Sequence, residues 1–209
     1  MRCTMPVYAT LNDLQQCIEK LKPRLLKLRE KARQNSIASF IDTSFSIQAD
    51  DFRMTVCEGD VRRPAARLQN GQLTITCPVG TKFDNDVLQQ WMVKVAEESL
   101  RHVAKRLLPL RLADLARRYG FTFSDVAIHK THGRWGSCSS KKKINLSLYL
   151  MLLPRHLQDY VMLHELCHTR EMNHSDRFWA EMDAVTNNRA AALRAEMKKY
   201  DTSIFQKIP

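Results

Sequence analysis

Residues 164–174 read HELCHTREMNH and hold three histidines and two glutamates. The four residues before them, YVML at 160–163, are mostly apolar, and Leu166 and Cys167 continue this character inside the stretch. A helix that is apolar nearly all round is normally buried. Burying an unpaired polar group costs roughly 2–7 kcal/mol, and an unpaired carboxylate costs more. The sequence therefore indicates a buried helix whose ionisable groups are paired, rather than an amphipathic helix with histidines on its surface.

His164 and His168 have the spacing of two ligands to one metal ion. Four residues apart on a helix, they lie on one face about 6 Å apart along the axis, and both imidazoles can reach the same ion. Glu165 lies about 100° further round, where it is poorly placed as a ligand and well placed to hold a metal-bound water. The pattern H-E-x-x-H is typical of zinc peptidases with a glutamate general base. We expect one Zn²⁺ per chain, and the same ligands suit other divalent metals.

A catalytic zinc ion usually has three protein ligands and one open position. His174 follows His168 by six residues, so it can be the third ligand if the helix ends between them and the chain turns back. Asn173 tolerates left-handed backbone and suits such a turn. The ligand spacing is that of the metzincins, but Glu171 stands where they have glycine. The alternative third ligands are carboxylates further along the chain, Glu181 or Asp183.

The remainder of the chain has the mixed pattern of an α+β fold. Alternating polarity predicts short strands, and Asn70-Gly71 predicts a hairpin with a type I′ turn. Apolar residues at helical spacing predict helices, the longest of which should divide at Pro109. The predicted strands cover residues 45–47, 52–56, 67–69, 72–75, 125–130 and 144–148, and the predicted helices cover residues 11–34, 84–119, 154–168 and a last segment capped by Asn173 or Ser175.

Composition limits the class of protein and its partners. The chain has 209 residues and a formal net charge of +11, which can attract a nucleotide, nucleic acid or anionic lipid. The positive residues are spread along the chain, which favours a basic, well-solvated surface without a specific partner. No apolar run reaches the roughly 18 residues of a membrane span. The N-terminus lacks the apolar segment of a secretory signal. We therefore expect a cytoplasmic protein with reduced thiols and no membrane partner, and no pattern specifies an oligomeric state.

Several short motifs occur in a characteristic order. They are RWGSCS at 134–139, INL at 144–146, YV at 160–161 before HELCH at 164–168, NHS at 173–175 and FW at 178–179. Over about residues 44–185 this order and spacing resembles the YgjP-like metallopeptidases. The resemblance implies a zincin-like fold with a small twisted β-sheet and an active-site helix, and it implies metal binding by His164, His168 and His174. We expect residues 41–209 to form this metallohydrolase domain and residues 1–40 to form an N-terminal helical extension.

The loop over residues 131–143 precedes a predicted strand, Ile144 to Leu148, which we expect to pair with an extended substrate. The loop would then line the cleft. Arg134 or His132 is suited to face negative charge that develops in a transition state. Trp135 is expected to anchor the loop in the core.

We expect a metallopeptidase that hydrolyses peptide bonds. Zn²⁺ lowers the pKa of its bound water to about 7, and Glu165 takes the proton and returns it to the leaving amine. One alternative is a metal-dependent phosphoanhydride hydrolase acting on nucleoside triphosphates, with Arg134 and the run of lysines at 141–143 binding phosphate. A second is a nucleic-acid-associated protein with a zincin domain. A third is a thiol enzyme using Cys138, which requires a lowered thiol pKa.

Overall fold

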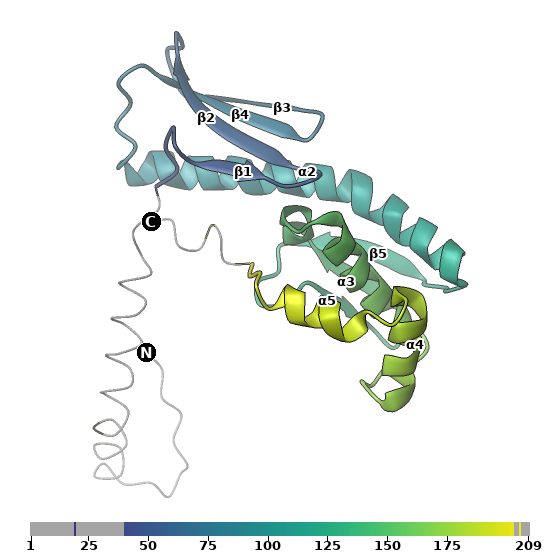
Figure 1. Ribbon diagram of the computed structural model, residues 1–209. Helices are drawn as coiled ribbons and strands as arrows, with labels where there is room; N and C mark the ends of the chain where they lie inside the picture. The colour runs from purple at the N-terminus through teal and green to yellow at the C-terminus, as the bar shows by residue number, and fades with distance from the viewer. Residues whose placement is uncertain (1–18, 20–39, 203–204, 206–209) are drawn as a thin grey trace, which may run out of the picture. The chain divides into compact units, whose positions relative to one another are not determined.

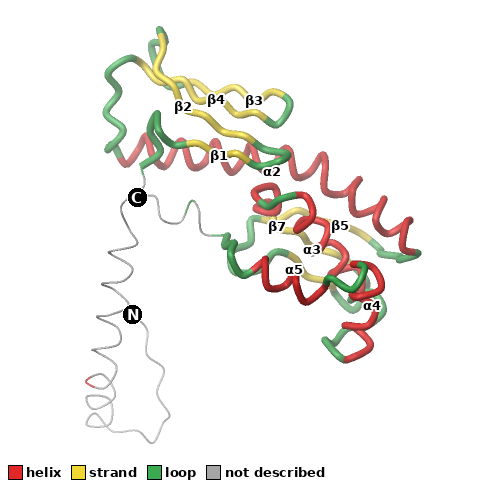
Figure 2. Tube along the Cα trace, viewed as in Figure 1, coloured by secondary structure: helices red, strands yellow, loops and turns green. Residues whose placement is uncertain are grey.

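The computed structural model describes residue 19, residues 40–202 and residue 205. Apart from residues 19 and 40, the predicted helix over residues 11–34 and the predicted N-terminal extension over residues 1–40 lie outside these residues. Figures 1 and 2 show groups of strands together with separate helices, the mixture of an α+β fold, so the predicted fold class is confirmed. In chain order the elements are β1 (Ser46–Gln48), β2 (Arg53–Gly59), β3 (Ala65–Gln69), β4 (Gln72–Pro78), α2 (Asp86–Tyr119), β5 (Asp125–His129), β6 (Gly136–Cys138), β7 (Lys143–Ser147), η1 (Leu148–Leu152), α3 (Arg155–Cys167), α4 (Asp176–Thr186) and α5 (Ala190–Met197).

Two small sheets are present among the described residues, where the sequence suggested one. The first has strand order β1-β2-β4-β3, and in it β2 and β4 run parallel while the other pairs are antiparallel. The β3–β4 hairpin turns at Asn70 and Gly71, which have φ of 50° and 80°. Positive φ at both central positions is the requirement of the type I′ turn, so the predicted hairpin is confirmed.

The second sheet has strand order β5-β7-β6. Its central strand β7 pairs in parallel with β5 and antiparallel with β6, so both of its edges are already used. The expectation that Ile144 to Leu148 pairs with a substrate is therefore wrong. The edge strands of this sheet are β5 and β6, and β6 lies within the segment predicted to be a loop. Three residues are too few to show an alternating polarity pattern, so this strand left no signal in the sequence.

Helix α2 continues through Pro109, so the predicted division there is wrong. Asn85 caps its start by accepting a hydrogen bond from the Leu88 amide, and Gly120 ends it with φ of 69°. Proline removes the hydrogen bond to the carbonyl four residues earlier, that of Lys105. Lys105 is an exposed residue. Buried residues before and after the proline, such as Leu108 and Leu112, hold the two halves against the same core. Tertiary packing therefore outweighs the local cost of proline.

Helix α3 is the most enclosed helix near the second sheet. It contacts α2, β6 and β7 as well as α4 and α5, and Figure 1 shows α2, α4 and α5 near it. Contact on several sides explains why most residues of its second half, 160–167, are apolar, as the sequence indicated. Within residues 40–202 no helix combines the length and apolar character that crossing a membrane requires.

Candidate metal centre

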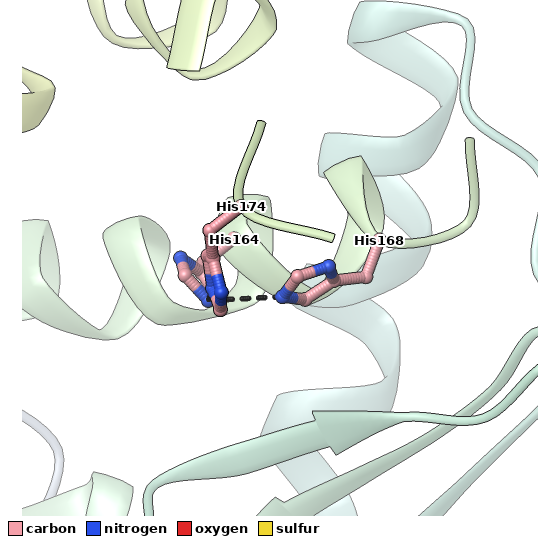
Figure 3. A group of neighbouring side chains, drawn as sticks. All are labelled: His164, His168 and His174. Atoms are coloured by element: carbon pink, nitrogen blue, oxygen red, sulfur yellow. Dashed lines mark hydrogen bonds between the residues drawn. The ribbon is translucent and has the colours of Figure 1, made fainter. Parts of the chain in front are cut away.

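Three histidines converge from two consecutive segments of the chain. His164 lies in the last turn of α3, His168 is the residue that ends this helix, and His174 lies in the connection to α4. Figure 3 shows their imidazoles turned toward one another. The ligand nitrogens of the three side chains all lie within 4.8 Å of one another.

The distances between these nitrogens suit a single small cation. Nε2 of His164 lies 3.2 Å from Nε2 of His168 and 3.1 Å from Nε2 of His174. Nitrogens bound to zinc at 2.0–2.1 Å in a tetrahedral site stand roughly 3.3 Å apart. Three neutral imidazole nitrogens that face one point can offer their lone pairs to one cation. The residues therefore fit a zinc ion, or another divalent metal of similar size, by their geometry and by the chemistry of their donor atoms.

The turn after α3 orients His168. The amide of Glu171 donates to the carbonyl of Cys167, which reverses the chain, and the carbonyl of Glu171 lies 3.0 Å from Nδ1 of His168. A carbonyl can only accept, so Nδ1 carries the proton and Nε2 presents its lone pair. Metal-bound histidines commonly have such a partner on the second nitrogen. Asn173, expected to adopt left-handed backbone here, does not have a positive φ.

Aromatic side chains surround the three imidazoles. The Phe178 ring lies within 5 Å of each imidazole, centroid to centroid. Burial lowers the pKa of His164 from 6.5 to about 3, and it also lowers the pKa of His174. Neutral imidazoles are the form that binds metal.

Glu165 lies next to the histidines and is buried. Its Oε1 and its side-chain carbons pack directly against Gly136 of β6, and its Oε2 has no hydrogen-bond partner among the described residues. Burial raises the pKa of this carboxyl to about 8, although the positive charge of Arg134 acts in the opposite direction. Like the charge of Arg134, a cation bound by the histidines would favour the ionised carboxylate of Glu165.

A cavity of about 590 Å³ opens in front of these groups. Two arginines line it, Arg134 from the segment before β6 and Arg194 from α5. Trp135 lines the cavity while also packing on the core, as predicted. The full lining is Arg134, Trp135, Gly136, Tyr160, Val161, His164, Glu165, His174, Trp179, Arg194 and Met197. Sequence reasoning missed Arg194, because nothing in its local sequence distinguishes it from other exposed arginines.

Other candidates from the sequence lie elsewhere. Glu181 forms an ion pair with Arg170, and Asp183 accepts from the Ala190 amide, so the structure does not bring either to the histidines. His132 contacts Tyr149 and the Thr202 carbonyl instead of lining the cavity. The lysines at 141–143 are exposed and do not line it.

The thiol of Cys138 does not suit a nucleophile. Burial, with a further contribution from Glu165, raises its pKa to about 11. A catalytic thiol requires the opposite shift, so the thiol-enzyme alternative is not supported.

Comparison with known proteins gives one family and one solved structure. A family model described as "YgjP-like, metallopeptidase domain" matches residues 1–200. Among solved structures, the chain is similar to the metallopeptidase zymogen abylysin of Pyrococcus abyssi, at 24% sequence identity and a TM-score of 0.38. This similarity covers 42% of the present chain and 90% of that chain. A comparison with curated proteins gives no match.

Proposed function

The chain belongs to the YgjP-like metallopeptidase family, and from this membership we propose that it is a zinc-dependent peptidase whose metal ligands are His164, His168 and His174 and whose general base is Glu165. Membership in a metallopeptidase family implies a divalent metal. The observation that carries the finer proposal is the convergence of three imidazole nitrogens beside a buried carboxyl group at one cavity. A bound zinc ion would supply Lewis acidity at this point and lower the pKa of a water molecule.

Glu165 is suited to move a proton. A general base works best when its pKa lies near the working pH, and burial moves the pKa of this carboxyl toward that range. Its free oxygen Oε2 has no competing partner among the described residues, and the residue lines the cavity. We assign to Glu165 the transfer of a proton from water to the nitrogen of the leaving amine.

The edge of β6 offers a place for the backbone of an extended peptide. On one side of this strand the Trp135 carbonyl accepts from Ser147, and the Ser139 amide donates to Lys143. In an antiparallel pair the backbone groups of alternate residues point to opposite sides. The amides and carbonyls of Gly136 and Cys138 therefore point away from β7, and no strand of the described residues pairs with them. A substrate that adds a strand here would lie beside Glu165.

Arg134 has a position consistent with stabilising negative charge. It lines the cavity next to β6, and its charge acts on Glu165. A fixed cation beside a carbonyl under attack stabilises the oxyanion that develops. We propose this role for Arg134 and exclude it for His132, which does not line the cavity.

The proposal is tested by metal analysis of the purified protein together with cleavage of a peptide library. We expect close to one zinc ion per chain and peptide cleavage that a chelator abolishes and added zinc restores. Cleavage of no peptide by the fully metal-loaded protein would refute the proposed activity.

A further inference from the structure

Arg194 of α5 lines the cavity and has no assigned role. Among described residues the carboxyl of Glu165 is the one acidic group lining the cavity, and it is 5% exposed. The remaining wall near Arg194 is formed mainly by apolar and aromatic side chains, namely Tyr160, Val161, Trp179 and Met197. The cavity is therefore positively charged on an apolar background.

Neither cavity arginine has a carboxylate partner within the part of the chain that the structure describes. Several other arginines in this part do have one: Arg111 pairs with Asp159, Arg155 with Asp51, and Arg170 with Glu181. A guanidinium that is left unpaired at the mouth of a cavity is available to a ligand, because its fork of N–H donors remains unused by the protein.

Packing holds Arg194 close to the metal centre. Its guanidinium lies 4.9 Å from the centre of the Trp179 ring, a cation–π distance. The same ring stacks on the imidazole of His174, with 5.9 Å between centroids. The preceding residue, Leu193, is buried, so the orientation of α5 is determined by the core. Arg194 is therefore directed toward the cavity by tertiary packing.

We propose that Arg194 binds a carboxylate of the peptide substrate and makes the enzyme selective for anionic peptides. This inference rests on the proposed peptidase function and adds a substrate class to it. Guanidinium and carboxylate groups form paired, charge-assisted hydrogen bonds, and an apolar surrounding strengthens them. A lysine or arginine side chain of a substrate would instead meet two like charges. The carboxylate comes from an aspartate or glutamate side chain or from the free C-terminus of the peptide.

The test measures binding to zinc-loaded Glu165→Gln protein, which holds a peptide without cleaving it. The probes are pairs of short peptides with blocked ends. The two peptides of a pair differ at one position, which is glutamate in one and glutamine in the other. This position is moved along the peptide from pair to pair. Loss of a charged hydrogen-bond partner weakens binding by about 10-fold or more. In the Glu165→Gln protein we expect the glutamate peptide to bind more tightly than its glutamine counterpart. We expect this difference to disappear when Arg194→Gln is added. The matched control is Arg189→Gln, which removes the same charge from an exposed residue outside the cavity and should keep the preference.

Further binding measurements identify which anionic group binds to Arg194. Peptides with a free C-terminus separate a terminal carboxylate from a side-chain carboxylate. Inorganic triphosphate is the competing anion, and Arg194-dependent binding of triphosphate that exceeds that of every peptide overturns the carboxylate assignment. The role of Arg194 is overturned if the Glu165→Gln protein does not prefer the glutamate peptide. It is also overturned if that preference remains after Arg194→Gln is added. Tight, charge-selective binding without cleavage by the wild-type enzyme instead refutes the peptidase function and leaves the binding site standing.

Discussion

Gly136 and Glu165 are in direct contact, although 29 positions separate them in the sequence. A Cβ atom placed on Gly136 would lie 2.7 Å from Oε1 of Glu165 and 2.8 Å from its Cγ. Real Cβ atoms do not approach heavy atoms this closely, so only glycine allows the backbone of β6 to lie against this carboxyl group. The glycine of the RWGSCS motif and the glutamate of the HELCH motif therefore form one structural unit.

The first prediction concerns this contact. Gly136→Ala should displace the Glu165 side chain and lower kcat at least 10-fold, because general-base catalysis contributes about 10²–10⁴-fold and depends on position. Zinc content should stay near that of the wild type, since the ligands are not touched. Peptide hydrolysis and metal analysis measure the two effects. Ser137→Ala, one residue along the same strand, is the control, and equal activity of both variants would contradict the prediction.

The second prediction concerns the metal. His168→Ala should lose most of its zinc, because only two of the three converging nitrogens remain. Elemental analysis after dialysis against a weak chelator measures this loss. His156→Ala is the control, since His156 precedes the metal centre on α3 and contacts Glu196 instead. Full zinc occupancy in His168→Ala would refute the assignment of the ligand.

The third prediction concerns Glu165 as a base. Glu165→Gln should bind zinc normally and lose about 10²–10⁴-fold in kcat, because an amide cannot accept the proton from water. Metal content and steady-state kinetics on the same preparation separate the two effects. Activity close to that of the wild type would exclude Glu165 as the proton acceptor.

The fourth prediction uses pH in the metal-free protein. The folded state raises the pKa of Glu165 from 4.5 to about 8 by burial, so it favours the protonated carboxyl. The stabilising contribution of this group is therefore complete below about pH 4.5 and is lost as the pH rises through about 8. Glutamine does not titrate, so metal-free Glu165→Gln should lose less stability than metal-free wild type over this range. Urea unfolding of both proteins as a function of pH measures the difference, and parallel profiles would contradict it.

The fifth prediction separates peptide hydrolysis from phosphoanhydride hydrolysis. If the substrate is a peptide paired with β6, Arg134→Ala should lower kcat and affect KM only mildly, and for a peptide without charged side chains added salt should have little effect. A nucleoside triphosphate would depend on exposed cations, so KM would rise sharply in Arg134→Ala and with salt, which screens charges beyond about 8 Å at physiological ionic strength. Kinetics on peptides and on a triphosphate panel decide between them. Zinc-dependent triphosphate hydrolysis that Arg134→Ala abolishes, with no peptide cleaved, would reverse our choice.

The candidate metal ligands could be predicted from the sequence because they depend on local geometry. Residues four apart on a helix share a face whatever surrounds the helix, so His164 and His168 converge by periodicity alone. His174 is close enough along the chain that a single turn brings it back. The Asn70-Gly71 hairpin was predictable for the same reason, since its turn depends on the φ angles of two neighbouring residues.

Other features were decided by contacts between residues far apart in the sequence. Whether β6 or β7 has a free edge depends on which strands pair, and three residues of β6 carry no pattern of their own. Helix α2 continues through Pro109 because a core on both sides of the proline outweighs a local preference. The position of Arg194 in the cavity follows from the packing of α5 against α3 and α4. Short-range geometry therefore determined the three converging histidines, while long-range packing determined the cavity, its charge and the strand edge beside them.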